Sequence, residues 1–537
     1  MNRGPWIIAI VAAIAATVSL FPAVEPNAVL TEDGPISGVA DSQNVTFYKG
    51  IPFAAPPVGD LRWRPPQPVA RWTRVRKADH FANACFQIQD HSRLPWTEPF
   101  MEQGPVSEDC LYLNVWTEAK TPSEGRPVMV FLYGGGFIEG SGSIAVYDGA
   151  HLASRGVVVV NMNYRVGPLG FLVYPELTKE SEHDSSGNYG LLDQIAALQW
   201  VHKNIAAFGG DPGRVMIFGQ SAGASSVYDL MHSPLAKGLF IRAIAESGVR
   251  IFASPSDSQP TLADREQMGV RWAETRGAHS LVELRALSPE MLFKPADAGR
   301  PVLSNQPVAD GWVLPSHSSA APASEVPIVM GMVADDIGVS PADFGPGQKP
   351  SVAAYREAAR RKYAEKTDEF LKLYPVTSDE SATAMKKDAA RDQARVSIDL
   401  WSANQIKQSG KVYTYYFDRA IPWPEHPEFG AFHTSEVPYV FENLELTRHP
   451  FERIDQQVSD SVSSYWMNFA ASGDPNGNSL ANWPAFTSDA HKTMELGVNM
   501  GPMPEAATPE RLAFQIAYLK KLSQPSGGKS DGQRIIR

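Results

Sequence analysis

Short apolar runs recur along the middle of the chain and predict buried β-strands. Within each run most residues are hydrophobic, so both faces of the strand are largely apolar. This is typical of strands that are covered on both sides of a sheet. The runs span residues 128–132, 157–160, 215–218, 241–245, 328–333 and 412–417.

Helical patterns alternate with these runs. From Tyr189 to Phe208 the apolar residues lie three and four positions apart and form one stripe. Residues 209–212 read Gly-Gly-Asp-Pro and predict a turn, and residues 353–408 predict helices outside the sheet. Strands alternating with helices predict an α/β fold, with a central, mostly parallel, twisted sheet and helices on both faces.

The composition fits a folded protein with one large core. The chain has 537 residues, of which 43% are hydrophobic, enough to bury an extensive core. The sequence contains no internal repeat and no linker that would divide it, so we expect residues 24–522 to form a single domain. The net charge of −11 makes nucleic acid an unfavourable partner, because an acidic protein repels phosphates.

The first residues predict export from the cytoplasm. A short basic start is followed by an apolar run from Pro5 to Phe21 and by small residues, a pattern typical of a signal peptide. The run is short for a membrane span, and an uncleaved anchor is the alternative. We expect residues 1–23 to be the signal peptide, the protein to be secreted or periplasmic without stable membrane association, and residues 523–537 to be a flexible polar tail.

One pentapeptide carries candidate chemistry. Gly219-Gln220-Ser221-Ala222-Gly223 directly follows a predicted strand and opens a helical pattern, which is the context of a nucleophile elbow. The flanking glycines are needed because the sharp turn leaves no room for a Cβ. We therefore predict that Ser221 is a catalytic nucleophile.

A second glycine-rich segment predicts the matching oxyanion hole. Gly134-Gly135-Gly136 follows the strand that ends at Leu132. Consecutive glycines let the backbone aim several amides at one point, and a tetrahedral intermediate needs such donors for its negative oxygen. We predict that the amides of Gly135, Gly136 and Ala222 form this oxyanion hole.

These motifs and several longer blocks resemble the type-B carboxylesterase and cholinesterase family. The resemblance runs from about residue 45 to residue 486 and implies a single α/β-hydrolase domain with its active site at the base of a gorge. It also implies a serine–acid–histidine triad in that chain order. The blocks are residues 50–59 (GIPFAAPPVG), 107–116 (SEDCLYLNVW), 163–167 (NYRVG) and 190–194 (GLLDQ).

The resemblance assigns the other two triad members. It places the histidine at His433, which lies after the last predicted strand, with the proline-flanked His426 as the weaker rival. It places the acid at Asp336, where the family usually has glutamate. The neighbouring Asp335 and the more distant Asp310 are the alternatives. The acid holds the histidine in the right tautomer, and the histidine relays the proton.

The resemblance also implies supporting residues. It places Ser247 and Glu436 behind the triad as hydrogen-bond partners, and it places Trp96 in a wall of the gorge. Phe137, Ile138 and Phe252 are further candidates for that wall.

Two pairings are expected to fix the scaffold. Cys85 and Cys110 are the only cysteines, and in an exported protein they suggest one disulfide; the position of Cys110 also matches the family. Buried charges need partners, and matching positions are paired in the family. The expected ion pairs are Arg165 with Asp193 and Arg62 with Glu108.

We expect a serine carboxylesterase that hydrolyses neutral esters through an acyl-enzyme. Cholinesterases carry a glutamate where this chain has Gln220, and Trp96 lies further from Cys110 than their choline-binding tryptophan lies from its cysteine. Both departures remove features that stabilise a cation. The alternatives are a non-catalytic binding or adhesion protein of the same family, which the presence of Ser221 and His433 opposes, and a lipase.

Motifs of other enzyme classes are missing from the sequence. It contains no zinc-protease helix motif and no fitting phosphate-binding glycine loop. Residues 474–478 superficially resemble a calcium loop but lack its glycine and terminal glutamate at the required places. We therefore expect no metal and no cofactor, and a small-molecule ester as the ligand.

Overall fold

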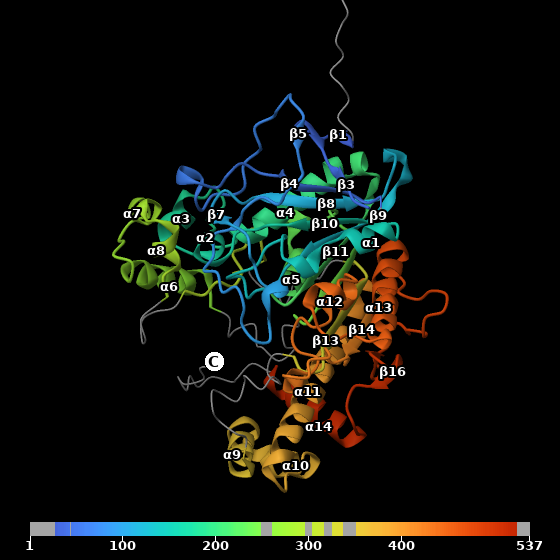
Figure 1. The fold of residues 1–537 in the computed structure, drawn as a ribbon. Helices are drawn as coiled ribbons and strands as arrows, with labels where there is room; N and C mark the ends of the chain where they lie inside the picture. The colour runs from blue at the N-terminus through green and yellow to red at the C-terminus, as the bar shows by residue number, and fades with distance from the viewer. Residues whose placement is uncertain are drawn as a thin grey trace, which may run out of the picture.

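One large sheet organises the chain. The computed structural model describes residues 27–42, 44–248, 260–295, 303–315, 325–336 and 351–523, and Figure 1 shows their arrangement. The sheet has 11 strands in the order β16-β15-β14-β13-β12-β11-β9-β10-β8-β4-β3. It is parallel from β10 to β15 and antiparallel at both ends. The predicted α/β fold with a mostly parallel sheet is confirmed.

The apolar runs form the parallel centre of the sheet. Every residue of β10, β13 and β14 is buried, so helices and loops cover both faces, as expected for such runs. The parallel strands are β9 (Arg126–Leu132), β10 (Val158–Met162), β11 (Gly210–Gln220), β12 (Arg242–Glu246), β13 (Ile328–Val333), β14 (Val412–Phe417) and β15 (Lys492–Leu496).

Short antiparallel strands flank this centre. The antiparallel members are β3 (Val39–Ala40), β4 (Thr46–Pro52), β8 (Tyr112–Thr117) and β16 (Gly501–Pro504). Two small sheets stand apart, one of β1 (Ala28–Leu30), β2 (Pro35–Ser37) and β5 (Arg76–Lys77), the other of β6 (Ala84–Cys85) and β7 (Val106–Ser107).

The predicted turn after the first long helix is partly wrong. The helix runs on into a 3-10 turn, Ile205–Phe208, which ends where Gly209 adopts a left-handed φ of +79°, as a C-terminal glycine permits. The next residue, Gly210, already pairs with Arg126 as the start of β11, and the register then shifts before Val215. Gly-Asp-Pro therefore forms an irregular stretch within a strand instead of a turn.

Helices cover the sheet. The predicted helix after Tyr189 is α4 (Tyr189–Asn204), which packs with α5 (Ala222–His232) and β11. The helical expectation for residues 353–408 is confirmed by α9 (Val352–Tyr363), α10 (Thr367–Leu373) and α11 (Asp379–Ser409). Figure 1 shows α9 and α10 at one end of the molecule, while α11 returns to the sheet, where it contacts β13 and β14.

The remaining helices surround this frame. They are α1 (Ala150–Ser154), α2 (Gly167–Phe171), α3 (Pro175–Glu180), α6 (Leu262–Glu274), α7 (Leu281–Ala286), α8 (Pro289–Phe293), α12 (Val437–Val440), α13 (Arg453–Ser472) and α14 (Pro509–Leu522). In the part of the chain that the structure describes, no helix is long and apolar enough to cross a membrane. The predicted signal peptide, residues 1–23, and nearly all of the predicted tail lie outside the described residues.

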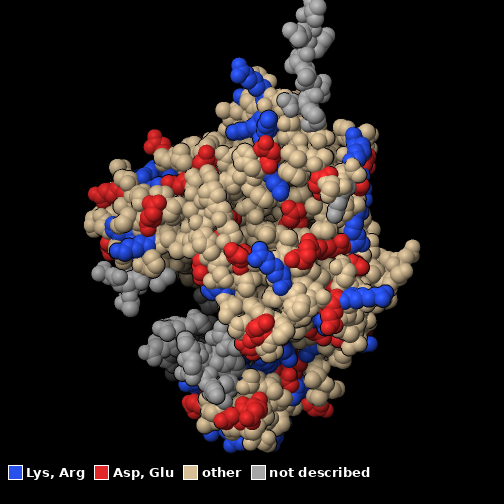
Figure 2. Space-filling view, viewed as in Figure 1, with Lys and Arg blue, Asp and Glu red and all other residues tan. Residues whose placement is uncertain are grey.

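The expected covalent and ionic pairings are confirmed. A disulfide joins Cys85 to Cys110. Arg165 donates to both carboxylate oxygens of Asp193, at 2.8 Å and 2.7 Å, and both residues are almost fully buried. The Arg62 guanidinium binds Glu108 through Nε at 2.6 Å. Lys, Arg, Asp and Glu side chains are interspersed over the face seen in Figure 2.

Candidate active site

The predicted nucleophile lies on the tight turn between β11 and α5. Ser221 adopts φ +58° and ψ −120°, a conformation that L-residues rarely adopt and that persists only where the surroundings enforce it. The surroundings are close: a Cβ on Gly223 would lie 1.9 Å from the Leu132 oxygen, and a Cβ on Gly219 would lie 2.7 Å from Gly223 backbone atoms. The backbone of β9 therefore presses directly against the turn, as the glycines predict.

The glycine loop after β9 lies against the same turn. Gly135 and Gly136 have φ values of +103° and +63°, and a Cβ on Gly134 would come within 2.9 Å of the Ser221 Cβ. Ala222 is the first residue of α5, where backbone N–H groups lack acceptors within the helix. The three amides predicted for the oxyanion hole thus come from two segments that meet at Ser221.

The structure brings His433 and Asp336 together. Asp336 stands just beyond the end of β13, and its Oδ1 lies 2.5 Å from Nδ1 of His433. Both residues are buried, at 7% and 9% exposure, so water competes little for this contact. His433, Asp336 and Ser221 line one cavity of about 410 Å³.

The rival residues are engaged elsewhere. Asp335 binds Lys387 and Arg391 instead of the histidine. Asp310 accepts hydrogen bonds from the Ser185 hydroxyl and from nearby backbone amides. His426 lies in a loop, where its Nδ1 is 3.1 Å from Glu428 Oε1. None of these contacts involves His433.

The second ring nitrogen of His433 faces Gln220, which sequence reasoning considered only for its missing charge. Gln220 Nε2 lies 3.3 Å from His433 Nε2. An amide N–H donates, and the imidazole Nε2 can accept from it when the ring carries its proton on Nδ1, toward Asp336. Among the described residues, no hydrogen bond joins the Ser221 hydroxyl to His433. Such catalytic contacts are often loose without substrate.

The residues predicted to line the gorge differ in where the structure places them. Trp96 packs edge-on against His433, and its Nε1 donates to the His433 carbonyl at 3.1 Å. Phe137 is 1% exposed and lines the 410 Å³ cavity, whereas Ile138 is 46% exposed and lines a second cavity of about 260 Å³. Phe252 lies outside the described residues.

Two carboxyl groups are buried behind the site. The Ser247 hydroxyl donates to Glu436 at 3.4 Å, as the resemblance implied. Burial, together with the charges of Glu246 and Asp336, raises the pKa of Glu436 well above its usual range. Burial also raises the pKa of Glu246 to about 7, although Trp466 Nε1 donates to it at 2.6 Å. Sequence reasoning missed Glu246; its one signal is an acidic residue at the end of a predicted buried strand.

Two cavities meet at the candidate site. Ser221, His433 and Gly136 line both of them, so a molecule with two arms can place its junction at the serine hydroxyl. The site offers a hydroxyl, an imidazole and backbone amides, which together suit acyl transfer. The described residues contain no cluster of side chains that could hold a metal ion.

Comparison with known proteins gives concordant matches. The sequence model of the carboxylesterase family matches residues 25–515. The chain is 37% identical to fumonisin B1 esterase of Sphingopyxis macrogoltabida, over 85% of this chain and 84% of that protein. It is 37% identical to para-nitrobenzyl esterase of Bacillus subtilis strain 168, over 87% and 94% of the two chains.

More distant matches point the same way. Acetylcholinesterase of Bungarus fasciatus is 31% identical, over 99% of this chain and 93% of that protein. The solved structure of a thermophilic PNB esterase superposes with a TM-score of 0.75 at 32% identity, covering 92% of this chain and 99% of that chain.

Proposed function

The chain belongs to the carboxylesterase family and is a carboxylic-ester hydrolase with the α/β-hydrolase fold, and we propose that it works through an acyl-enzyme on Ser221. In this proposal His433 is the general base and acid, and Asp336 is the acid of the triad. The contact between His433 Nδ1 and Asp336 Oδ1, beside the cavity that Ser221 lines, supports the assignment most strongly. Residues 24–522 act as one catalytic unit.

The reaction follows from the positions of these groups. The ester carbonyl oxygen faces the amides of Gly135, Gly136 and Ala222, and Ser221 Oγ attacks the carbonyl carbon while its proton passes to His433 Nε2. The amides stabilise the tetrahedral oxyanion. His433 then protonates the leaving alcohol, and water, activated by the same nitrogen, releases the acid and frees the serine.

Competition between water and methanol tests the acyl-enzyme. Butyrate esters of different alcohols should all pass through one butyryl-Ser221 species, so the ratio of methyl butyrate to butyrate at fixed methanol should not depend on the leaving alcohol. A ratio that changes with the alcohol would mean direct attack of water on the ester. Ser221→Ala should abolish both products.

We further propose a preference for neutral esters. Beside His433 the cavity presents the uncharged Gln220, and the nearby carboxylate of Glu102 is already bound by Ser141 and Ser143. At the position beside His433, an uncharged amide therefore stands where an anion would stabilise a cationic alcohol.

A matched pair of substrates checks this preference. Butyrylcholine and 3,3-dimethylbutyl butyrate have the same shape and differ in charge. The neutral ester should have the higher kcat/KM, and Gln220→Glu should shift the ratio toward the choline ester. A higher kcat/KM for butyrylcholine in the parent protein would overturn the proposal.

The disulfide favours an oxidising compartment. With the sequence of the first residues, it supports the proposal that the protein is secreted or periplasmic. Edman or mass-spectrometric determination of the mature N-terminus in the producing cell tests this proposal.

A further inference from the structure

The residue before the triad acid makes contacts that bear on both Asp336 and His433. Asp335 follows β13 and is 6% exposed. Its backbone N–H donates to the Ala431 carbonyl at 2.9 Å, and its carboxylate Oδ2 accepts from the Ala431 N–H at 3.1 Å. Because Ala431 lies two residues before His433, one aspartate fastens the segment that carries the acid to the segment that carries the base.

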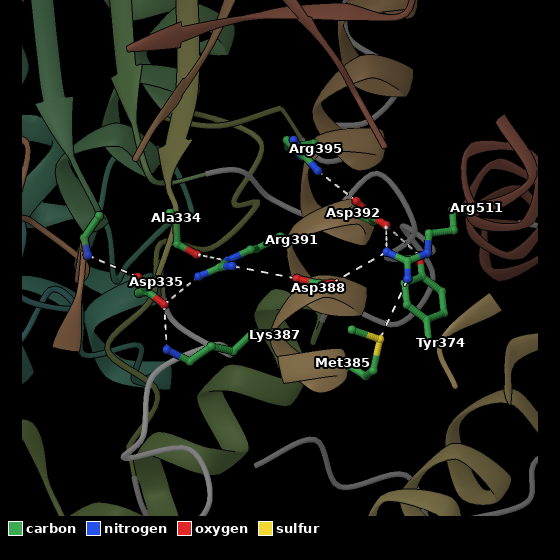
Figure 3. Close-up of polar contacts among 11 residues, drawn as sticks. Ala334, Asp335, Tyr374, Met385, Lys387, Asp388, Arg391, Asp392, Arg395 and Arg511 are labelled. Atoms are coloured by element: carbon green, nitrogen blue, oxygen red, sulfur yellow. Dashed lines mark hydrogen bonds and ion pairs between the residues drawn. The ribbon is translucent and has the colours of Figure 1, made fainter. Parts of the chain in front are cut away.

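The other oxygen of Asp335 is held from a third element. Oδ1 accepts from Lys387 Nζ at 2.7 Å and from Arg391 Nη2 at 2.8 Å, both on α11. Arg391 Nε also donates to the Ala334 carbonyl at 2.8 Å. Figure 3 shows Lys387 and Arg391 pointing toward Asp335, and Arg391 also reaching Ala334. The carboxylate is thus fixed on both oxygens, and two positive charges compensate its burial.

The fit around this carboxylate is close. Gly430 has a φ of +59°, and a Cβ there would lie 2.1 Å from Asp335 Oδ2. Only glycine therefore allows the loop to approach Asp335 while it adopts this left-handed conformation. The loop before His433 is shaped to meet the Asp335 side chain.

Beyond Arg391 a chain of charges links α11 to α14. Asp388 lies 3.8 Å from Arg391 and 3.7 Å from Arg511, whose guanidinium also stands 4.3 Å from the Tyr374 ring centroid. Figure 3 shows Arg391, Asp388 and Arg511 in one row that crosses α11. The cations that hold Asp335 therefore belong to a helix that is itself anchored, so they can act as fixed points.

We propose that Asp335 is a positioning residue, which sets the relative placement of Asp336 and His433 under the control of Lys387 and Arg391. The inference rests on the proposed function of Ser221, His433 and Asp336. The carboxylate of Asp335 touches no reacting atom. It acts through the Ala431 contact and through the peptide bond to Asp336, and it turns two loops into one rigid support for the imidazole.

The test separates positioning from stability by the choice of leaving group. Asp335→Asn keeps the shape but loses the charge that holds Lys387 and Arg391. A displaced imidazole protonates the leaving alcohol poorly, which matters for ethyl butyrate and little for 4-nitrophenyl butyrate, whose phenolate leaves unaided. Per site titrated with a fluorophosphonate, kcat/KM should fall about 10- to 100-fold for the ethyl ester and several-fold less for the nitrophenyl ester.

Glu380→Gln is the matched control. It removes one carboxylate from an exposed position of α11 and leaves the contacts of Asp335 in place, so both esters should keep kcat/KM within about twofold. If Asp335→Asn yields no titratable sites, Lys387→Met is tested instead. Its kcat/KM should also fall more for the ethyl ester than for the nitrophenyl ester, by a smaller factor. A Lys387→Met variant without that difference would overturn the proposal.

Three results with Asp335→Asn would also overturn it. They are unchanged kcat/KM per site, an equal loss on both esters, and a loss as large as that of Asp336→Asn, which would make Asp335 the triad acid. Failure of the proposed function would look different, because the parent protein itself would then not be titrated at Ser221.

Discussion

The nucleophile side and the histidine side of the site are held in different ways. On the nucleophile side, β9, β11 and α5 meet backbone against backbone, with no room for a Cβ at Gly219 or Gly223. On the histidine side, side chains make the contacts that matter, and Asp336 meets His433 across 97 positions of sequence. The first arrangement has little freedom to adjust, whereas the second depends on charges that hold separate loops together.

This difference predicts how each side fails. A change on the nucleophile side strains the backbone and lowers stability together with activity. A change on the histidine side can keep the fold and still abolish activity. The loops there are held by side-chain hydrogen bonds, and an isosteric substitution can remove one such bond without changing the packing.

The largest effect is expected from Asp336→Asn. Asparagine keeps the shape but cannot stabilise the imidazolium, so kcat should fall by roughly 10³–10⁴-fold while the melting temperature stays close to that of the parent. Steady-state kinetics on one activated ester, with thermal unfolding, measure both quantities. Asp310→Asn is the control and should keep its kcat per titrated site. Comparable losses in the two variants would contradict the assignment of Asp336.

Gly223→Ala should have the opposite signature. The added methyl group would meet the Leu132 carbonyl oxygen at 1.9 Å, and because that oxygen belongs to a central strand it cannot move cheaply. We expect a loss of about 3 kcal/mol or more in the free energy of unfolding, at the upper end of overpacking, measured by urea denaturation. Gly501→Ala adds a methyl group with no atom within 4 Å and should be nearly neutral. Equal stability of the two variants would contradict the view that close backbone packing holds the nucleophile side.

A smaller effect concerns the buried carboxyl behind the histidine. The raised pKa of Glu436 means that the folded protein keeps a proton that the unfolded chain releases above about pH 4.3. Its contribution to stability is therefore full below that pH and is lost as pH rises toward the folded-state pKa, by up to about 1.4 kcal/mol per pH unit.

Glu436→Gln should remove that loss. Between pH 5.5 and 7.5 the free energy of unfolding should fall less steeply in the variant than in the parent, as urea denaturation at each pH can show. Glu445→Gln, at a side chain that is 61% exposed, controls for the loss of one acidic residue. A variant as pH-sensitive as the parent would show that Glu436 is ionised in the folded state.

The sequence predicts the nucleophile side better than the histidine side for a physical reason. The strained backbone at Ser221 requires glycines within two residues of it, so the sequence shows this turn as a short local motif. The long apolar runs were equally readable, and β13 and β14 have the bounds that their runs predict. The strands β15 and β16 were missed because Lys492–Leu496 mixes polar and apolar residues at the margin of the sheet.

The histidine side left fewer local signals. The family resemblance identified His433 and Asp336 as candidates. No sequence pattern predicts that the Gln220 amide faces the imidazole or that the Asp335 side chain points toward α11. These contacts join residues separated by 52 to 213 positions, and only the folded chain brings them together. The choice between two adjacent aspartates is a matter of side-chain direction, which spacing alone does not determine.

Covalent labelling tests the central claim most directly. The parent protein should take up one fluorophosphonate per chain, and peptide mass spectrometry should find the adduct on Ser221. Ser221→Ala should take up none, and His433→Ala should react at least about 10³-fold more slowly, since the serine then lacks its base. An adduct on another residue, or a parent protein that hydrolyses esters without being labelled, would contradict the account.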